Sequence, residues 1–145
     1  MPYFSTQLYD GFSCCFRNWR ATSATHYLHG SSLSFKLVFG CEYLDDKHRV
    51  LDTVNEIRNQ LKQHFEYKTL IAIDDPLLER FTDLENLGLV QLTILPSVNC
   101  ESFAHTGYNL AQSIIEQEYP DGRTLVESCE VLEHNNSAIY VRDKQ

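Results

Sequence analysis

Residues 31–39 read SSLSFKLVF, and apolar and polar side chains alternate along this stretch. The odd positions from Leu33 to Phe39 are all apolar, whereas Ser34 and Lys36 stand at even positions between them. A period of two is typical of a strand that buries one face and exposes the other. These residues therefore predict a strand in a sheet that is covered on one side, and the covering elements should lie elsewhere in the chain.

The segments on either side of this strand predict a second strand and a helix. Residues 3–16 read as an earlier strand, with Gly11 at a bulge. Across residues 54–65, apolar side chains recur three or four positions apart, behind Asp52 and Thr53, which suit a helix N-terminus. We therefore expect a pair of strands followed by an amphipathic helix.

The second half of the chain adds helical and extended segments in turn. Residues 74–81 begin with Asp-Asp-Pro and predict a short helical turn, because proline is tolerated at a first helical position. Residues 89–95 are typical of a strand, and residues 99–118 have the spacing of a second amphipathic helix. Residues 125–133 and 138–141 predict a closing hairpin.

Length and composition place the chain among compact soluble proteins. It has 145 residues, of which 43% are hydrophobic and 22% charged, as is typical of one globular domain spanning residues 1–145. No apolar run approaches the ~18 residues that a membrane helix needs, and the first residues do not resemble a secretion signal. We expect a soluble, cytoplasmic protein without a membrane partner.

Charge and cysteine usage narrow the set of partners. A net charge of -8 and a pI near 5.1 argue against nucleic acid as a principal partner. The five cysteines lack the paired spacing of a zinc finger and the density of a secreted disulfide scaffold. We expect them to be reduced thiols in the core: Cys14, Cys15, Cys41, Cys100 and Cys129.

Five short motifs occur in an order that resembles a known family. They are LHG at residues 28–30, VLD at 50–52, FEYKTL at 65–70, TGYNLA at 106–111, and VLE at 131–133 with Ala138 and Tyr140. Over roughly residues 4–140, the chain resembles the 6-pyruvoyl- and 6-carboxy-tetrahydropterin synthase family. Residues 13–20 and the Asp74-Asp75-Pro76 motif are similar to a bacterial branch of it, with an additional helix and strand at about residues 74–95.

The resemblance implies an α+β protein with the tunnelling fold, or T-fold. In that fold two helices pack on one face of an antiparallel sheet, and oligomerisation completes a barrel. Two short hairpins and two helices cannot close a barrel alone, and an unpaired sheet edge favours pairing with another subunit. We therefore expect a homo-oligomer, either a trimer-based ring or a hexamer.

The family's zinc site is changed in this chain. By resemblance, the three zinc-binding histidines of the family correspond to Phe16, His29 and Ser31, so only His29 keeps an imidazole. One imidazole cannot hold zinc, which needs at least three protein ligands. We expect zinc to be absent or weakly bound; the alternative is a rearranged site in which Cys14 joins His29, with His26 or His105 recruited from elsewhere.

The family's catalytic groups are changed as well. Thr25 stands where the family has its catalytic cysteine, and Glu66 and Tyr67 stand where it has an Asp-His pair. A threonine hydroxyl is too weak an acid to replace a thiolate unless a separate base activates it. A Glu66/Tyr67 pair that shuttles protons remains an alternative. The sequence therefore leaves open whether the carbon-oxygen lyase reaction of the family is still catalysed.

The ligand-binding positions are better preserved. In the family, a carboxylate at the position of Glu133 accepts two parallel hydrogen bonds from the pterin, an arrangement that also suits guanine-like purines. Thr106 would assist, and Arg17 and Arg20 are candidates either for a triphosphate or for surface salt bridges. The resemblance implies a pterin or purine ligand such as dihydroneopterin triphosphate, in pterin or queuosine biosynthesis. The alternative is a non-catalytic oligomeric binding or interaction protein.

Overall fold

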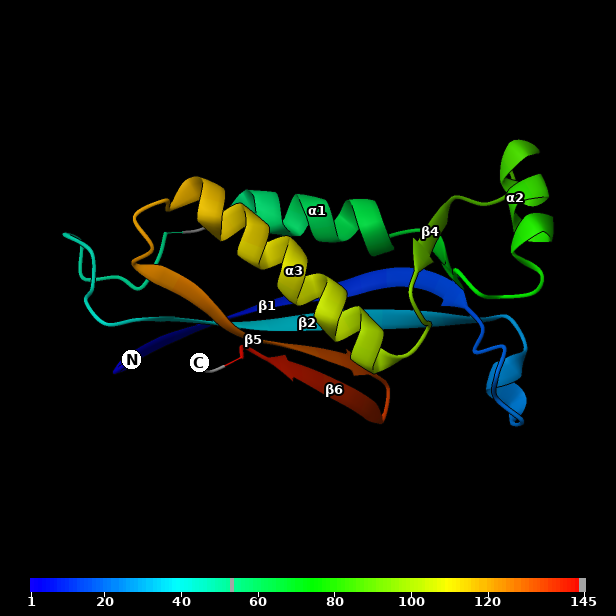
Figure 1. The fold of residues 1–145 in the computed structure, drawn as a ribbon, viewed down its shortest axis with the longest axis horizontal. Coiled ribbons are helices and arrows are strands. Elements are labelled where there is room, and N and C mark those ends of the chain that lie inside the picture. Colours follow the sequence, from blue (N-terminus) through cyan, green and yellow to red (C-terminus); the bar gives the residue numbers. More distant parts are fainter. Residues whose placement is uncertain (53, 144–145) are drawn as a thin grey trace.

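The computed structural model describes residues 1–52 and 54–143 of the chain. Strands and helices alternate along it, and the strands form one six-stranded sheet (Figure 1). In chain order the elements are β1 (Tyr3–Phe16), the 3-10 turn η1 (Ala24–His26), β2 (His29–Cys41), α1 (Asn55–Phe65), β3 (Lys68–Ala72), α2 (Leu78–Asn86), β4 (Leu92–Leu95), α3 (Cys100–Glu118), β5 (Thr124–Glu133) and β6 (Asn136–Val141).

The sheet is mixed, with the strand order β4-β3-β1-β2-β5-β6. Antiparallel pairing joins β1 to β2, β2 to β5 and β5 to β6, as expected. In contrast, β3 pairs in parallel with β1 and with β4, so the sheet is not antiparallel throughout. Strand β2 runs opposite to β1, so the chain reverses once more before β3, which then runs in the direction of β1; α2 is the helical crossover that joins the parallel neighbours β3 and β4.

Strand β3 was not predicted from the sequence. Residues 69–72 are all buried, so the strand lacks the alternation that marks a half-exposed strand. The other strands were predicted with small differences at their ends. The largest difference is in β4, which begins at Leu92 rather than at residue 89.

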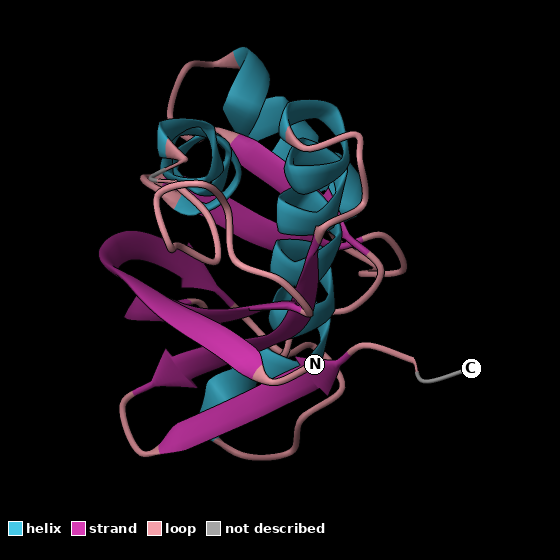
Figure 2. Cartoon of the chain, turned by 90° about the vertical axis from the view of Figure 1, so that its left-hand side faces the viewer, coloured by secondary structure: helices cyan, strands magenta, loops and turns pink. Residues whose placement is uncertain are grey.

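Helices α1 and α3 cover one face of the sheet, as the α+β prediction required (Figures 1 and 2). Phe65 of α1 packs on Phe35 of β2, with ring centroids 4.8 Å apart. Gly107 lets α3 approach the sheet closely, because a Cβ at this position would lie 2.9 Å from the Cys129 sulfur. The core thus forms between the two helices and the inner side chains of β1, β2 and β5.

A bulge adjusts β1 to this core. Gly11 has φ +82°, and the register with β2 shifts between Tyr9 and Phe12, as predicted. Both Tyr9 and Phe12 are buried, although three positions separate them. The extra residue therefore keeps both halves of the long strand facing the helices, and it aims Cys14 and Phe16 inward.

The two helix starts differ from each other. Asn99 caps α3, and its side-chain oxygen accepts a hydrogen bond of 2.8 Å from the backbone N–H of Ser102. The predicted capping of α1 by Asp52 is wrong, because the N-cap residue is Val54, which makes no side-chain capping hydrogen bond. Asp52 instead pairs with Arg49 at 3.0 Å. Thr53, the other predicted cap, lies outside the described residues.

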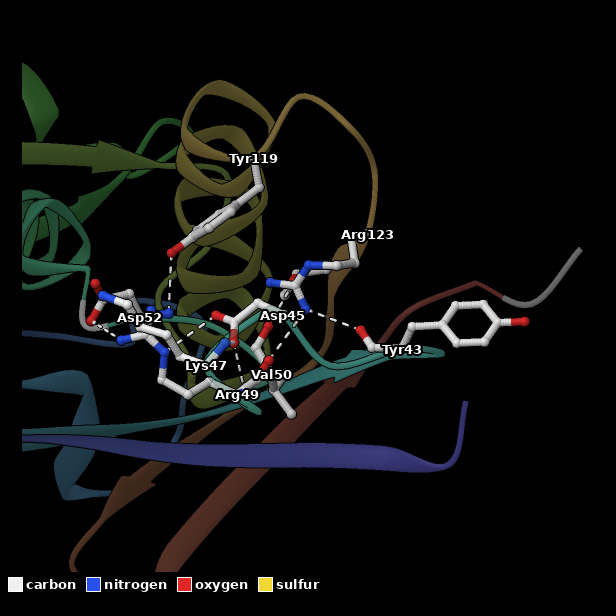
Figure 3. A network of polar contacts seen from close by, with 9 residues as sticks. Tyr43, Asp45, Lys47, Arg49, Val50, Asp52, Tyr119 and Arg123 are labelled. Atoms are coloured by element: carbon white, nitrogen blue, oxygen red, sulfur yellow. Dashed lines mark hydrogen bonds and ion pairs between the residues drawn. The ribbon is translucent and has the colours of Figure 1, made fainter.

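The connection between β2 and α1 is held by a polar network (Figure 3). Asp45 accepts hydrogen bonds from the backbone and side chain of Arg49 at 2.8 and 3.2 Å. Arg123, just before β5, donates to the backbone oxygen of Tyr43 at 3.1 Å. These contacts fasten the loop to the end of the molecule opposite η1.

None of the described helices has both the length and the apolar character needed to cross a membrane.

Candidate functional site

A cavity of about 300 Å³ opens where β1, β2, the start of α3 and the β5–β6 turn meet. Three of the predicted site residues lie in its wall: Thr25, His29 and Glu133. The start of α3 contributes Cys100 and Glu101. Segments distant in the sequence thus converge on one cavity.

Glu133 ends β5 and is half-buried. The thiol of Cys100, the first residue of α3, donates to Glu133 Oε2 at 3.6 Å. Burial, followed by the nearby charge of Glu133, raises the pKa of Cys100 to about 12. The thiol is therefore neutral at physiological pH, and it holds one carboxylate oxygen while the carboxylate borders the cavity.

His29 begins β2 and has a defined tautomer. Its Nδ1 lies 2.8 Å from the backbone oxygen of Tyr27. A carbonyl oxygen only accepts, so Nδ1 carries the proton, and Nε2 of the neutral ring is an acceptor. The Phe16 ring packs against the imidazole at 4.8 Å between centroids in an edge-to-face arrangement. One side of the cavity is thus partly aromatic.

The positions of the family's zinc ligands do come together, but their side chains do not fit zinc. Phe16 pairs with His29, and Cys14 pairs with Ser31, across β1 and β2. Burial, with smaller contributions from Cys15 and Glu133, raises the pKa of Cys14 to about 12. A single imidazole, a neutral thiol and a hydroxyl are a poor donor set for zinc.

The histidines considered as replacement ligands, His26 and His105, do not line the Glu133 cavity. Nδ1 of His26 lies 2.9 Å from the backbone oxygen of Trp19, and His105 stacks on Tyr140 with 4.4 Å between centroids. Within the described residues, no group of three His, Cys, Asp or Glu side chains is placed to hold a metal ion. The low zinc content of the purified protein remains a prediction.

The other predicted residues lie apart from this cavity. Glu66 accepts a 3.4 Å hydrogen bond from the backbone of Ser13, and Tyr67 is 75% exposed. Tyr67 borders a separate cavity of about 310 Å³, which is lined by residues of β1, of β3 and of the segment before β4. Thr106 is half-buried on α3 and does not line the Glu133 cavity. In a single chain, Thr25 therefore does not share a cavity with the Glu66/Tyr67 pair.

The two candidate arginines form ion pairs with the segment between β3 and α2. Arg17 makes a bidentate pair with Asp75 at 2.9 and 2.6 Å, and Arg20 contacts Asp74 at 2.9 Å. Burial raises the pKa of Asp75, but hydrogen bonds from Arg17 and the Leu77 backbone outweigh it, and the net pKa is lowered. The sequence left Arg17 and Arg20 as candidates for binding a triphosphate or for forming salt bridges, and in the structure both form salt bridges.

Solved structures of other proteins have the same fold as this chain. No family model matches the sequence, and no curated protein matches it. Among solved structures, an uncharacterized protein from Wolinella succinogenes superposes with a TM-score of 0.81 at 21% identity, covering 97% of this chain and 98% of that one. The 6-pyruvoyl tetrahydropterin synthase of Plasmodium falciparum gives 0.66 at 13% identity, over 96% and 98%. That of Caenorhabditis elegans gives 0.62 at 12%, over 97% of both chains.

The chain has the fold of the 6-pyruvoyl tetrahydropterin synthases. At these identities the likeness concerns the fold alone, so the chemistry must be argued from the residues. Among them, sequence reasoning missed Cys100, which it treated as one more core thiol. The signal was its place beside Asn99, a good N-cap at a predicted helix start, but only the fold brings that helix start to the hairpin that carries Glu133.

Proposed function

We propose that the chain is a 6-pyruvoyl-tetrahydropterin-synthase-like protein that binds a pterin or a guanine-type purine in the cavity beside Glu133. The observation that carries this proposal is the half-buried Glu133 carboxylate, which borders the cavity and is held at one oxygen by the Cys100 thiol. A carboxylate in such a place suits the paired N–H groups of these ring edges, because it accepts two parallel hydrogen bonds.

The site favours binding over the family's lyase reaction. The hydroxyl of Thr25 lies 2.9 Å from that of Ser23, and no base among the described residues contacts it. A hydroxyl needs such a base to act as a nucleophile or proton carrier. These residues therefore favour the second candidate function, in which the chain is an oligomeric protein that binds the ligand without catalysing a reaction.

Binding is tested by calorimetry with 7,8-dihydroneopterin and with guanine, using the parent protein and Glu133→Gln. Loss of the charged acceptor should cost about 1.5 to 3 kcal/mol, or one to two decades in affinity. Glu130→Gln is the matched control: it is on the same strand and half-buried, but it does not line the cavity. Equal affinity of Glu133→Gln and the parent, or no heat with either ligand, would contradict the proposal.

We also propose that the protein is a homo-oligomer, a trimer or a hexamer. Strand β1 pairs with β3 only at residues 14–16, so most of its outer edge is open within the described chain. Two apolar side chains are exposed on the sheet face away from the helices: Leu8 (56%) on β1 and Ile139 (57%) on β6. These two strands lie at the two ends of the antiparallel part of the sheet. Exposed edges and apolar side chains of this kind favour pairing with another copy.

Light scattering at micromolar concentration tests the assembly. The parent should have the mass of three or six chains, and Leu8→Glu should shift the mass toward one chain by placing a charge in the interface. Thr22→Glu, at an exposed position in the β1–β2 connection, is the control and should leave the mass unchanged. A parent protein that is a monodisperse monomer would be incompatible with this proposal.

A further inference from the structure

The walls of the Glu133 cavity have an unusual charge for a site that would hold a phosphorylated ligand. Glu101 and Glu133 are acidic, and the described residues that line the cavity include no lysine or arginine. The whole chain carries a net charge of -8. An anionic group that enters this cavity therefore meets like charges without a local counter-charge.

Two arginines next to the cavity wall are already paired, Arg17 in a nearly buried ion pair and Arg20 in an exposed one. Arg17 and Arg20 flank Asn18, which is in the cavity wall, but both guanidinium groups are paired with carboxylates. The Arg17 side chain is 11% exposed and its partner Asp75 has no exposed side-chain surface. Diverting Arg17 to a phosphate would leave a buried carboxylate unpaired, which is strongly unfavourable.

The aromatic side of the cavity has no group for a charged tail either. Phe16 packs on the His29 imidazole with 4.8 Å between ring centroids. The polar groups that remain around the site are side-chain oxygens and nitrogens of uncharged residues such as Asn18, Thr25 and Asn99. These groups suit a ring with neutral hydrogen-bonding edges.

We propose that this cavity selects an unphosphorylated pterin or guanine-type ring and rejects the corresponding triphosphate. The proposal rests on the proposed function, because it uses Glu133 as the anchor of the ring. It makes the dihydroneopterin triphosphate expected from the family resemblance a poor ligand. The discrimination comes from repulsion by Glu101 and Glu133 and from the absence of an unpaired basic side chain in the described wall.

Two matched ligand pairs test the proposal by calorimetry without divalent cations: 7,8-dihydroneopterin with its triphosphate, and guanosine with guanosine triphosphate. The unphosphorylated member should bind at least about tenfold tighter at low ionic strength. The reason is that the negative phosphates of a bound triphosphate would lie within about a nanometre of the Glu101 and Glu133 carboxylates and be repelled by them. Raising the salt concentration should narrow that ratio, since screening weakens the repulsion of the triphosphate and leaves the neutral ligand unaffected.

Charge variants locate the effect. Glu101→Gln and Glu101→Lys should raise triphosphate affinity, in that order, and should raise it more than they change the affinity for the unphosphorylated ligand. Glu118→Lys, at an exposed position at the other end of α3, should change neither. Equal or tighter binding of a triphosphate by the parent would overturn this proposal while supporting the Glu133 site. Absence of binding by all four ligands would instead overturn the proposed function together with it.

Discussion

The two sides of the cavity differ in what they retain. On one side Glu133 presents the carboxylate to which we assign the proposed pterin or guanine edge, and Cys100 contacts it at 3.6 Å. On the other side, the zinc positions are occupied by Phe16, His29 and Ser31, which pack as part of the core and sheet rather than as a ligand set. In the proposed function, the group that recognises the ligand and the positions that the resemblance assigns to zinc are therefore different side chains.

The three residues that the resemblance assigns to zinc ligands lie close together in the sheet. Phe16 is directly opposite His29 in the sheet, and Ser31 lies two residues along β2, on the same face as His29. The Ser31 hydroxyl is buried and has no hydrogen-bond partner within the described chain. The Ser31 hydroxyl is thus a buried polar group on the same face of β2 as His29.

Rebuilding the three histidines should give the largest effect. We expect the parent to contain little zinc and Phe16→His/Ser31→His to bind about one zinc ion per chain, because three imidazoles then converge at one place. Apparent free energies for complete zinc sites reach about 10 kcal/mol or more at neutral pH. Elemental analysis of the dialysed proteins measures the difference.

The matched control for this variant removes the shared imidazole. Phe16→His/His29→Ala/Ser31→His should lose the zinc again, because only two of the three ligands remain. Near-stoichiometric zinc in the parent that disappears on His29→Ala would show that Cys14 or another side chain completes a site. A double variant that folds without zinc would mean that the backbone has also changed.

Breaking the buried Arg17–Asp75 ion pair should have the next largest effect, on the free energy of unfolding. Asp75→Asn leaves the Arg17 guanidinium without its charged partner, so the free energy of unfolding should fall by about 3 to 5 kcal/mol. Urea unfolding followed by circular dichroism measures it. Asp74→Asn is the control, since the Arg20–Asp74 pair is exposed on both sides and should contribute less than about 1 kcal/mol.

The same pair predicts how stability depends on pH. The pKa of Asp75 is lower in the folded protein than in the unfolded chain, so the folded state binds fewer protons there. Its contribution is fully present above the unfolded pKa of about 4 and is lost as the pH falls through the lower folded pKa. Asp75→Asn should flatten this acidic part of the stability curve, and an unchanged curve would contradict the role given to the pair.

Much of the fold could be predicted from local patterns because those patterns report burial on one face. The alternation around Leu37 and the helical spacing around Ile57 both follow from a single covered side. Strand β3 escaped prediction because residues 69–72 are buried on both faces, which removes the alternation. Its parallel pairing depends on where α1 returns the chain, and no local pattern contains that information.

The candidate site was less predictable for a similar reason. Glu133, His29 and Thr25 were found through a family resemblance, and the fold brings them to one cavity. The resemblance did not indicate that Arg17 would be paired with Asp75, because their distance in space depends on the segment that follows β3. Nor did it identify Cys100, since its role exists only through contact with Glu133.

Removing the Cys100 contact should have the smallest effect, and it tests whether this thiol positions Glu133 for ligand binding. Cys100→Ala removes the donor to Glu133 Oε2, so the carboxylate loses one restraint and ligand affinity should fall by about 1 kcal/mol, or roughly fivefold. Cys100→Ser keeps a donor at that position and should bind within about twofold of the parent. Calorimetry with 7,8-dihydroneopterin or guanine measures both variants, and thermal unfolding shows whether either is destabilised.

Cys41→Ala separates this role from a general loss of core packing. Cys41 is also a buried thiol, but it lies at the far end of β2 and does not line the cavity. Its replacement should lower stability as much as Cys100→Ala or more, because it is the more buried of the two, and leave ligand affinity unchanged. If Ala and Ser at position 100 weaken binding equally, the thiol does not act by donating to Glu133. The carboxylate would then be positioned by the β5–β6 turn alone, whose residues Glu133 and Asn136 face each other across the hairpin.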